Sequence, residues 1–289
     1  MNKALEKLRN AFHTYLHSFT EKKLILKTFL AEGAVLFLLW STLNWLKNEV
    51  ASRTEQILQG RTPEELKQLL LSSSPEKMLP FLQQTKSFLI FLFVGYGLFF
   101  LLGFLFFALS RAYIWNSLHQ SRLSTKNYWR WNALMLIFPI LLIFYAIISM
   151  LVKLFFLWII KALLQMNAVF YFSHQDTVAG ILSQVNTLLN FIFVLIFLIF
   201  AFTVGWQFVK KYKVFESLGD GFSLLGKHRK VLSLHLFFAV ITTLVISLLL
   251  LFVTRTFFLS PQSMLLINAG ISLLFLCWFR VYVVRTLQE

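Results

Sequence analysis

The sequence is poor in charge. Only 13% of its 289 residues are charged, whereas about a quarter are charged in a typical soluble domain. Hydrophobic residues make up 58% of the chain, and phenylalanine alone occurs 34 times. A water-soluble fold could not bury that much apolar surface, so lipid must be the solvent for most of the chain.

Cysteine and the common catalytic motifs are also scarce. The chain has one cysteine, Cys277, so an internal disulfide is excluded. Cys277 lies within an apolar run, where we expect it to act as a small hydrophobic side chain. The sequence has no HExxH helix, no GxxxxGKS or GxxxxGKT loop and no GxSxG turn. We therefore expect no metal, no cofactor and no catalytic residue.

Six apolar runs are long enough to cross a bilayer, which needs about 20 residues per helix. They cover residues 28–46, 87–110, 132–152, 186–209, 231–253 and 263–284. No aspartate falls within these runs, which excludes an intramembrane aspartyl pair. The sequence predicts an all-α polytopic bundle that forms one transmembrane domain over residues 1–289.

The net charge of +15 does not indicate a nucleic-acid partner, because Lys and Arg flank the apolar runs. Anionic lipid headgroups are the expected partners of these residues. Of the 27 Lys and Arg, 18 fall at the two ends and in the connections after the second and fourth runs. The other 9 fall in the alternate connections. The positive-inside rule then places both termini in the cytoplasm, and we expect the cell membrane as the location.

Two groups of residues at predicted membrane boundaries are candidates for contacts with lipid headgroups. They are Trp129, Arg130 and Trp131 before the third span, and Lys227, Arg229 and Lys230 before the fifth. Tryptophan concentrates at membrane interfaces, and basic residues concentrate on the cytoplasmic side. A stacking site for nucleic-acid bases is the alternative for the first group, and the composition disfavours it.

The N-terminal segment, residues 1–27, is expected to be an amphipathic helix on the cytoplasmic membrane surface. Five apolar residues recur at helical spacing: Leu5, Leu8, Phe12, Leu16 and Phe19. A signal peptide is not expected, because no small-residue cleavage pattern follows the first apolar run. A mitochondrial presequence would have a similar pattern, but Glu6 and Glu21 disfavour it.

Residues 47–86 form the longest connection, which we expect to be external and to contain two or three short helices. Thr62 to Glu65 is a capping box with proline at the first helical position, and Ser74-Pro75-Glu76 is a second start signal. Five glutamates gather here and could attract a cation. Helix capping and solvation explain them more simply.

Residues 153–165 allow two interpretations. They could extend the third span along the outer interface, or they could form a re-entrant segment. Lys153 and Lys161 are eight residues apart and share a helical face. Lysines near a helix end reach the headgroups easily, which favours the interfacial extension.

A weak internal repeat relates residues 87–153 to residues 187–253. A shift of 100 residues aligns the two segments without a gap, and Leu89, Phe91 and Phe93 fall on Leu189, Phe191 and Phe193. Leucine and phenylalanine also coincide by chance in apolar spans, so composition is the competing explanation. The repeat would be a parallel duplication, unlike the inverted repeats of many transporters.

The segment from Glu216 to Phe222, followed by Lys227-His228-Arg229-Lys230 and an apolar span, resembles a recurring pattern. The pattern occurs in uncharacterised multi-span membrane families of archaea and bacteria. It is also similar to the membrane domain attached to some glycerophosphodiester phosphodiesterases. The resemblance covers residues 87–253 and implies a helical bundle. It does not imply the phosphodiesterase activity, because this chain has no room for the soluble domain.

Two charged residues lie inside predicted spans, where charge is costly and often functional. Glu32 lies in the first span and Arg280 in the sixth, at similar depth on the cytoplasmic side. We predict that they form an intramembrane ion pair between the first and last helices. The alternative is that each side chain reaches the headgroups separately.

Three classes of function remain after these exclusions. The chain could be a non-enzymatic membrane component that binds lipid or a membrane protein partner. It could be a transporter or a protein that moves lipid. It could also be an enzyme of a type that carries no known motif. The small number of charges within the spans argues against an ion-coupled pump, and we favour the first class.

Overall fold

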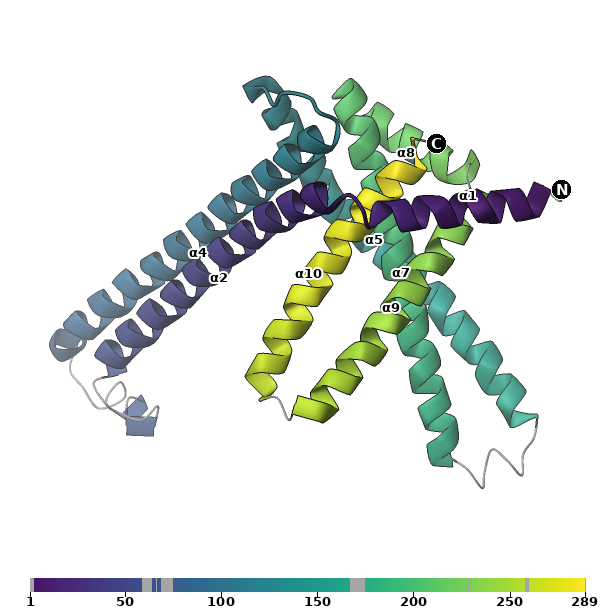
Figure 1. The fold of residues 1–289 in the computed structure, drawn as a ribbon. Helices are drawn as coiled ribbons and strands as arrows, with labels where there is room; N and C mark the ends of the chain where they lie inside the picture. Colours follow the sequence, from purple (N-terminus) through teal and green to yellow (C-terminus); the bar gives the residue numbers. More distant parts are fainter. Residues whose placement is uncertain are drawn as a thin grey trace. The chain divides into compact units, whose positions relative to one another are not determined.

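The computed structural model describes residues 3–58, 64–65, 67–68, 75–166, 175–227, 229–257 and 260–288. Regular structure in these ranges is entirely helical (Figure 1). The helices are α1 (Lys3–Ser18), α2 (Lys22–Leu58), α4 (Pro75–Leu118), α5 (Thr125–Gln165), α7 (Gln175–Lys211), α8 (Val214–Lys227), α9 (Arg229–Phe257) and α10 (Pro261–Thr286).

Six of these helices contain stretches long and apolar enough to cross a membrane. They are Lys22–Leu58, Leu79–Leu118, Thr125–Gln165, Gln175–Lys211, Leu236–Thr256 and Pro261–Thr286. No residue in the most apolar stretches of α4 and α5 is buried within the fold. Such continuous apolar surfaces are not stable in water. The all-α polytopic prediction is confirmed, and the chain is a multi-pass membrane protein.

Helix α2 is longer than the apolar run predicted. It continues to Leu58, so residues 47–58 extend the first span and do not form a separate short helix. Helix α5 continues through residues 153–165 as one uninterrupted helix, which agrees with the favoured interpretation of these residues as an extension of the third span. Neither extension contains glycine or proline, so nothing in the backbone ends the helix at the edge of the apolar run.

The helix boundaries follow capping chemistry. Ser124 precedes α5, and its side chain accepts a hydrogen bond from the Asn127 backbone N–H. Ser260 precedes α10, and its side chain accepts a hydrogen bond from the Ser263 backbone N–H; the helix then begins with Pro261. Helix α4 begins at Pro75, as the second start signal predicted. The capping box at Thr62 lies outside the described residues.

Contacts divide the chain into two compact units. One unit comprises Met1–Phe29 and Ala112–Glu289, and the other comprises Leu30–Arg111. We call them the large unit and the α2–α4 hairpin. This division is not visible in the hydropathy pattern, which shows only six successive runs.

The core of the large unit lies around the C-terminal part of α7, which packs against α5, α8 and α10. The ring of Trp131 meets that of Phe208 edge to face, with centroids 4.8 Å apart. Trp115 packs directly over Gly205, where a side chain would leave no room for the indole. Two polar contacts join α5 to α7: the Tyr145 hydroxyl donates to the Phe193 carbonyl at 2.7 Å, and Lys153 Nζ donates to Asn190 Oδ1 at 3.1 Å.

Helix α1 is docked onto α9 and α10 within the large unit. The Tyr15 hydroxyl and the Thr242 hydroxyl are 2.9 Å apart, and Trp278 Nε1 donates to Ser18 Oγ at 2.9 Å. Arg285 forms an ion pair with Glu21 just after α1. The predicted helix is therefore present, and these polar contacts add to ring contacts of the apolar stripe, in which Phe12 meets Phe238 and Phe19 stacks on Trp278. Phe12, Leu16 and Phe19 remain exposed.

The two halves of the proposed repeat differ after their first span. Helix α7 is followed by the separate helix α8. The corresponding connection after α4 has no helix between Leu118 and Thr125, because α4 itself continues to Leu118. The duplication stays a prediction.

We predict that Gly205→Ala destabilises the large unit. A Cβ at Gly205 would lie 2.5–2.9 Å from three atoms of the buried Trp115 ring, and overpacking of this kind costs about 1–3 kcal/mol. Thermal unfolding in detergent, followed by near-ultraviolet circular dichroism, measures the change. Gly180→Ala is the matched control in the same helix, because a Cβ there meets nothing within 4 Å. Equal melting temperatures for the two variants would contradict this packing.

Candidate functional site

The α2–α4 hairpin has a regular seam. Glu32, Leu39, Leu46 and Arg53 are spaced seven residues apart on α2. A seven-residue spacing keeps side chains on one helical stripe that faces a neighbouring helix. The stripe therefore has a charged residue at each end and leucines between them.

The two leucines pack over glycines of α4. A Cβ at Gly95 would lie 3.1 Å from Leu46 Cδ1, and one at Gly103 would lie 2.9 Å from Leu39 Cδ2. Each glycine provides the space for one leucine, so the two helices lock in register.

One end of the seam is a buried ion pair. Arg111 Nη1 donates to Glu32 Oε1 at 2.5 Å, and the Glu32 side chain is only 3% exposed. The Arg111 guanidinium also lies over the Phe107 ring, 4.6 Å from its centroid. Removing one partner from a buried pair leaves the other charge poorly compensated, which is strongly destabilising.

The predicted pair of Glu32 with Arg280 stays a prediction. The two residues belong to separate units, and Arg111 is one partner of Glu32 within the hairpin. Arg280 is 1% exposed in the core of the large unit, where its guanidinium carbon lies 5.1 Å from the Phe202 ring centroid and 5.9 Å from that of Trp115. Aromatic faces attract a cation electrostatically, which helps the fold to accept this buried charge.

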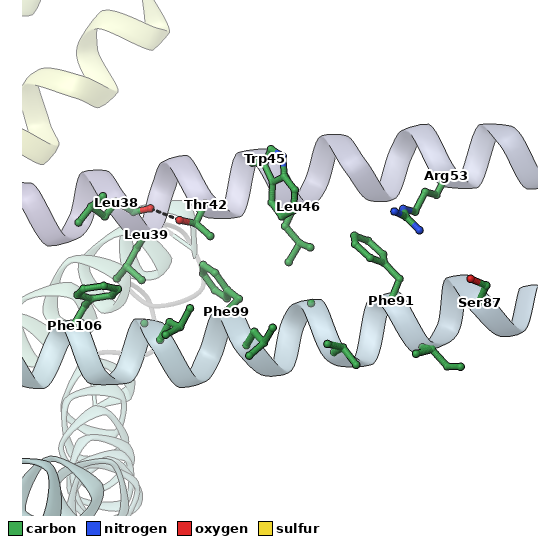
Figure 2. A pocket seen from close by; sticks show the side chains of 16 residues that line it. Leu38, Leu39, Thr42, Trp45, Leu46, Arg53, Ser87, Phe91, Phe99 and Phe106 are labelled. Atoms are coloured by element: carbon green, nitrogen blue, oxygen red, sulfur yellow. Dashed lines mark hydrogen bonds between the residues drawn. The ribbon is translucent and has the colours of Figure 1, made fainter.

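The other end of the seam is Arg53. Its Nε donates to Glu49 Oε1 at 2.8 Å, one helical turn away. Its guanidinium lies over the Phe91 ring of α4, 4.0 Å from the centroid. Figure 2 shows Arg53 and Phe91 extended toward each other from the two helices. These two contacts fix the position of the guanidinium.

The seam matches the thickness of a membrane. Glu32 and Arg53 are 21 residues apart, which corresponds to about 32 Å along a helix. The hydrocarbon core of a bilayer is about 30 Å thick. Glu32 and Arg53 are thus about one hydrocarbon thickness apart on α2. They are separated by the apolar stretch up to residue 46 and by the charged residues Lys47 and Glu49 that follow it.

An apolar groove runs along this stretch between α2 and α4 (Figure 2). It has a volume of about 630 Å³, and its walls are mainly leucine and phenylalanine, with Arg53 and Ser87 at one end. The Thr42 hydroxyl in its wall donates to the Leu38 carbonyl at 2.8 Å and so offers little to a ligand. We call this cavity the hairpin groove. It can accommodate an elongated apolar molecule with a polar end group.

The residues predicted to contact lipid headgroups differ in their exposure. Trp129 and Arg130 are exposed, and Lys227 is exposed at the end of α8. Trp131 is 0% exposed, so it is a core residue and not a surface residue. The side chains of Arg229 and Lys230 lie outside the described part of the structure. Lipid contact stays a prediction for the exposed residues.

His119 follows the end of α4 and stacks on Trp206, with ring centroids 3.8 Å apart. Burial lowers the pKa of His119 below its ordinary value, and the nearby Lys210 lowers it further, against a backbone hydrogen bond to Trp206 that raises it. The imidazole is therefore neutral at pH 7 and acts as a packing group there.

Arg53 and Arg111 are the site residues that the sequence analysis missed. The spacing of Glu32, Leu39, Leu46 and Arg53 was the signal that could have identified the seam. The first span was expected to end before Arg53, so Arg53 was not placed on the same helix as Glu32. Arg111 was counted only as a loop charge, although α4 continues past it.

Comparison of the chain with known protein families, curated proteins and solved structures finds no significant match. The resemblance to membrane domains of glycerophosphodiester phosphodiesterases therefore stays a prediction.

We predict that Glu32 and Arg111 are energetically coupled. Glu32→Gln, Arg111→Gln and the double variant are compared by chemical unfolding in detergent micelles. The buried geometry should give a coupling energy of about 1–3 kcal/mol. Arg122→Gln, at an exposed arginine, should change stability by less than about 0.5 kcal/mol. Additive effects of the two single changes would show that the ion pair does not hold the hairpin.

Proposed function

We propose that this protein is a non-enzymatic membrane component that binds a lipid in the hairpin groove. The groove itself is the observation that carries the proposal. It is apolar along the depth of the hydrocarbon region and has a cation at one end. Ligand pockets are typically apolar cavities of about 300–1,000 Å³ with a few polar groups that fix orientation.

The chemistry of the groove favours binding over catalysis. Its lining residues include no carboxylate, imidazole or thiol that could act as a general base or nucleophile. The hydroxyls of Thr42 and Ser87 have no base among these residues to activate them. A groove of this kind offers a ligand an apolar surface of defined shape and one positive charge, that of Arg53.

Lipid movement between the leaflets is the second candidate function. The length of the groove favours it, because the lining extends from Arg53 along α4 to Phe106, five residues before Arg111. A path of that length could guide a lipid across the membrane. Rapid exchange of fluorescent lipid between leaflets of vesicles that contain the purified protein would support this function over stable binding.

We expect the purified protein to retain lipid at a fixed stoichiometry in native mass spectrometry. Leu98→Trp should reduce retention because the larger side chain fills the groove that Leu98 lines. Leu101→Trp is the matched control: Leu98 is 51% exposed and Leu101 is 55% exposed, but Leu101 does not line the groove. Equal retention by both variants, or no retained lipid in the unmodified protein, would contradict lipid binding in the groove.

We further propose that the protein resides in the cell membrane with both termini in the cytoplasm. The distribution of Lys and Arg between alternate connections supports this orientation. It places the connection between α2 and α4 outside and the connection between α4 and α5 inside.

Cysteine labelling in intact cells tests this orientation. In a Cys277→Ser background, a membrane-impermeant maleimide should label Gln68→Cys and should label Lys126→Cys only after the cells are opened. Both positions are exposed, so accessibility within the fold does not distinguish them. The reverse labelling pattern would overturn the orientation.

A further inference from the structure

Arg53 lines one end of the hairpin groove and forms an ion pair with Glu49, which lies one helical turn away and outside the groove lining. The ion pair engages Nε of Arg53, and the guanidinium face rests on Phe91. The side chains of Arg53 and Glu49 are 39% and 35% exposed, so both remain accessible. Arg53 lies about one hydrocarbon thickness from Glu32 along α2.

We propose that the ligand of the hairpin groove is a zwitterionic glycerophospholipid, which rests on the proposed function of lipid binding. Its phosphate binds the terminal nitrogens of Arg53, its headgroup ammonium binds Glu49, and an acyl chain lies along the groove. A planar guanidinium matches the geometry of phosphate oxygens and donates charge-assisted hydrogen bonds to them.

The charge pair explains the choice of headgroup. A fatty acid or phosphatidylglycerol could bind Arg53, but neither supplies a cation to Glu49, whose carboxylate would lie beside the bound anion. A headgroup with both phosphate and ammonium complements both side chains at once. Electrostatic complementarity of this kind gives selectivity among ligands.

A helix of another protein fits the groove less well than an acyl chain. Close helix packing in membranes relies on small residues that let backbones approach. Leu46 and Leu39 already occupy the space over Gly95 and Gly103. The remaining walls are mainly leucine, isoleucine, valine and phenylalanine side chains, with Thr42 and Trp45 on α2, and they suit a flexible hydrocarbon chain.

Native mass spectrometry with defined lipids tests the proposal. The full-length protein in detergent is titrated with phosphatidylethanolamine and with phosphatidylglycerol of identical acyl chains. The unmodified protein should prefer phosphatidylethanolamine. Arg53→Gln should weaken its binding about tenfold or more, as expected for the loss of charge-assisted hydrogen bonds, and Arg53→Lys should restore part of it. Glu49→Gln should abolish the headgroup preference by improving phosphatidylglycerol binding.

Lys86→Gln is the matched control for Arg53→Gln. Lys86 is an exposed cation next to Ser87 of the groove, but it does not line the groove and lies in a neighbouring cavity with Leu82 and Phe93. Its loss should leave the affinity within about twofold. Melting temperatures of all variants show whether the hairpin remains folded.

The outcomes separate this inference from the proposed function. Lipid binding that is equally strong in Arg53→Gln and Lys86→Gln overturns the inference and leaves lipid binding in the groove intact. A headgroup preference that Glu49→Gln does not change also overturns it. Failure of the unmodified protein to bind either lipid, or a stoichiometric protein in place of lipid, overturns both.

Discussion

The thickness of the hydrocarbon region is the constraint on which the α2–α4 hairpin depends. Charges are costly inside hydrocarbon and inexpensive at its edges. Helix α2 has its seam charges at Glu32 and Arg53, about one hydrocarbon thickness apart. Between them, Leu39 and Leu46 pack over glycines of α4. The spacing that satisfies the membrane is thus the same spacing that sets the register of the two helices.

In the large unit, a buried charge lies against aromatic rings. Arg280 lies in its core against the faces of Phe202 and Trp115, while α1 is held to α9 and α10 by Tyr15 and Ser18. In lipid there is little hydrophobic driving force between helices, so close packing and polar contacts must provide the association. The contact of Trp115 with Gly205 and the hydrogen bond from Tyr145 to Phe193 supply these two kinds of interaction.

The helical fold was predictable because it depends on local features of the chain. Every backbone polar group in lipid must be satisfied within its own helix, so six long apolar runs imply six helices. The start signal around Pro75 also marked the first residue of α4. The length of α2 was underestimated, because hydropathy reports where lipid lies and not where the helical backbone ends. Polar residues 47–58 continue α2 without any breaker.

The sequence by itself determined the solvent and the six helices that are long and apolar enough to cross a membrane, because both depend on composition along the chain. The tertiary structure decided which residues meet across helices. The contact of Glu32 with Arg111 follows from the register of α2 against α4, which the hydropathy pattern does not contain. Trp129 and Trp131, two residues apart, look alike in the sequence, yet Trp129 is exposed and Trp131 is buried against Phe208, because they face opposite sides of α5.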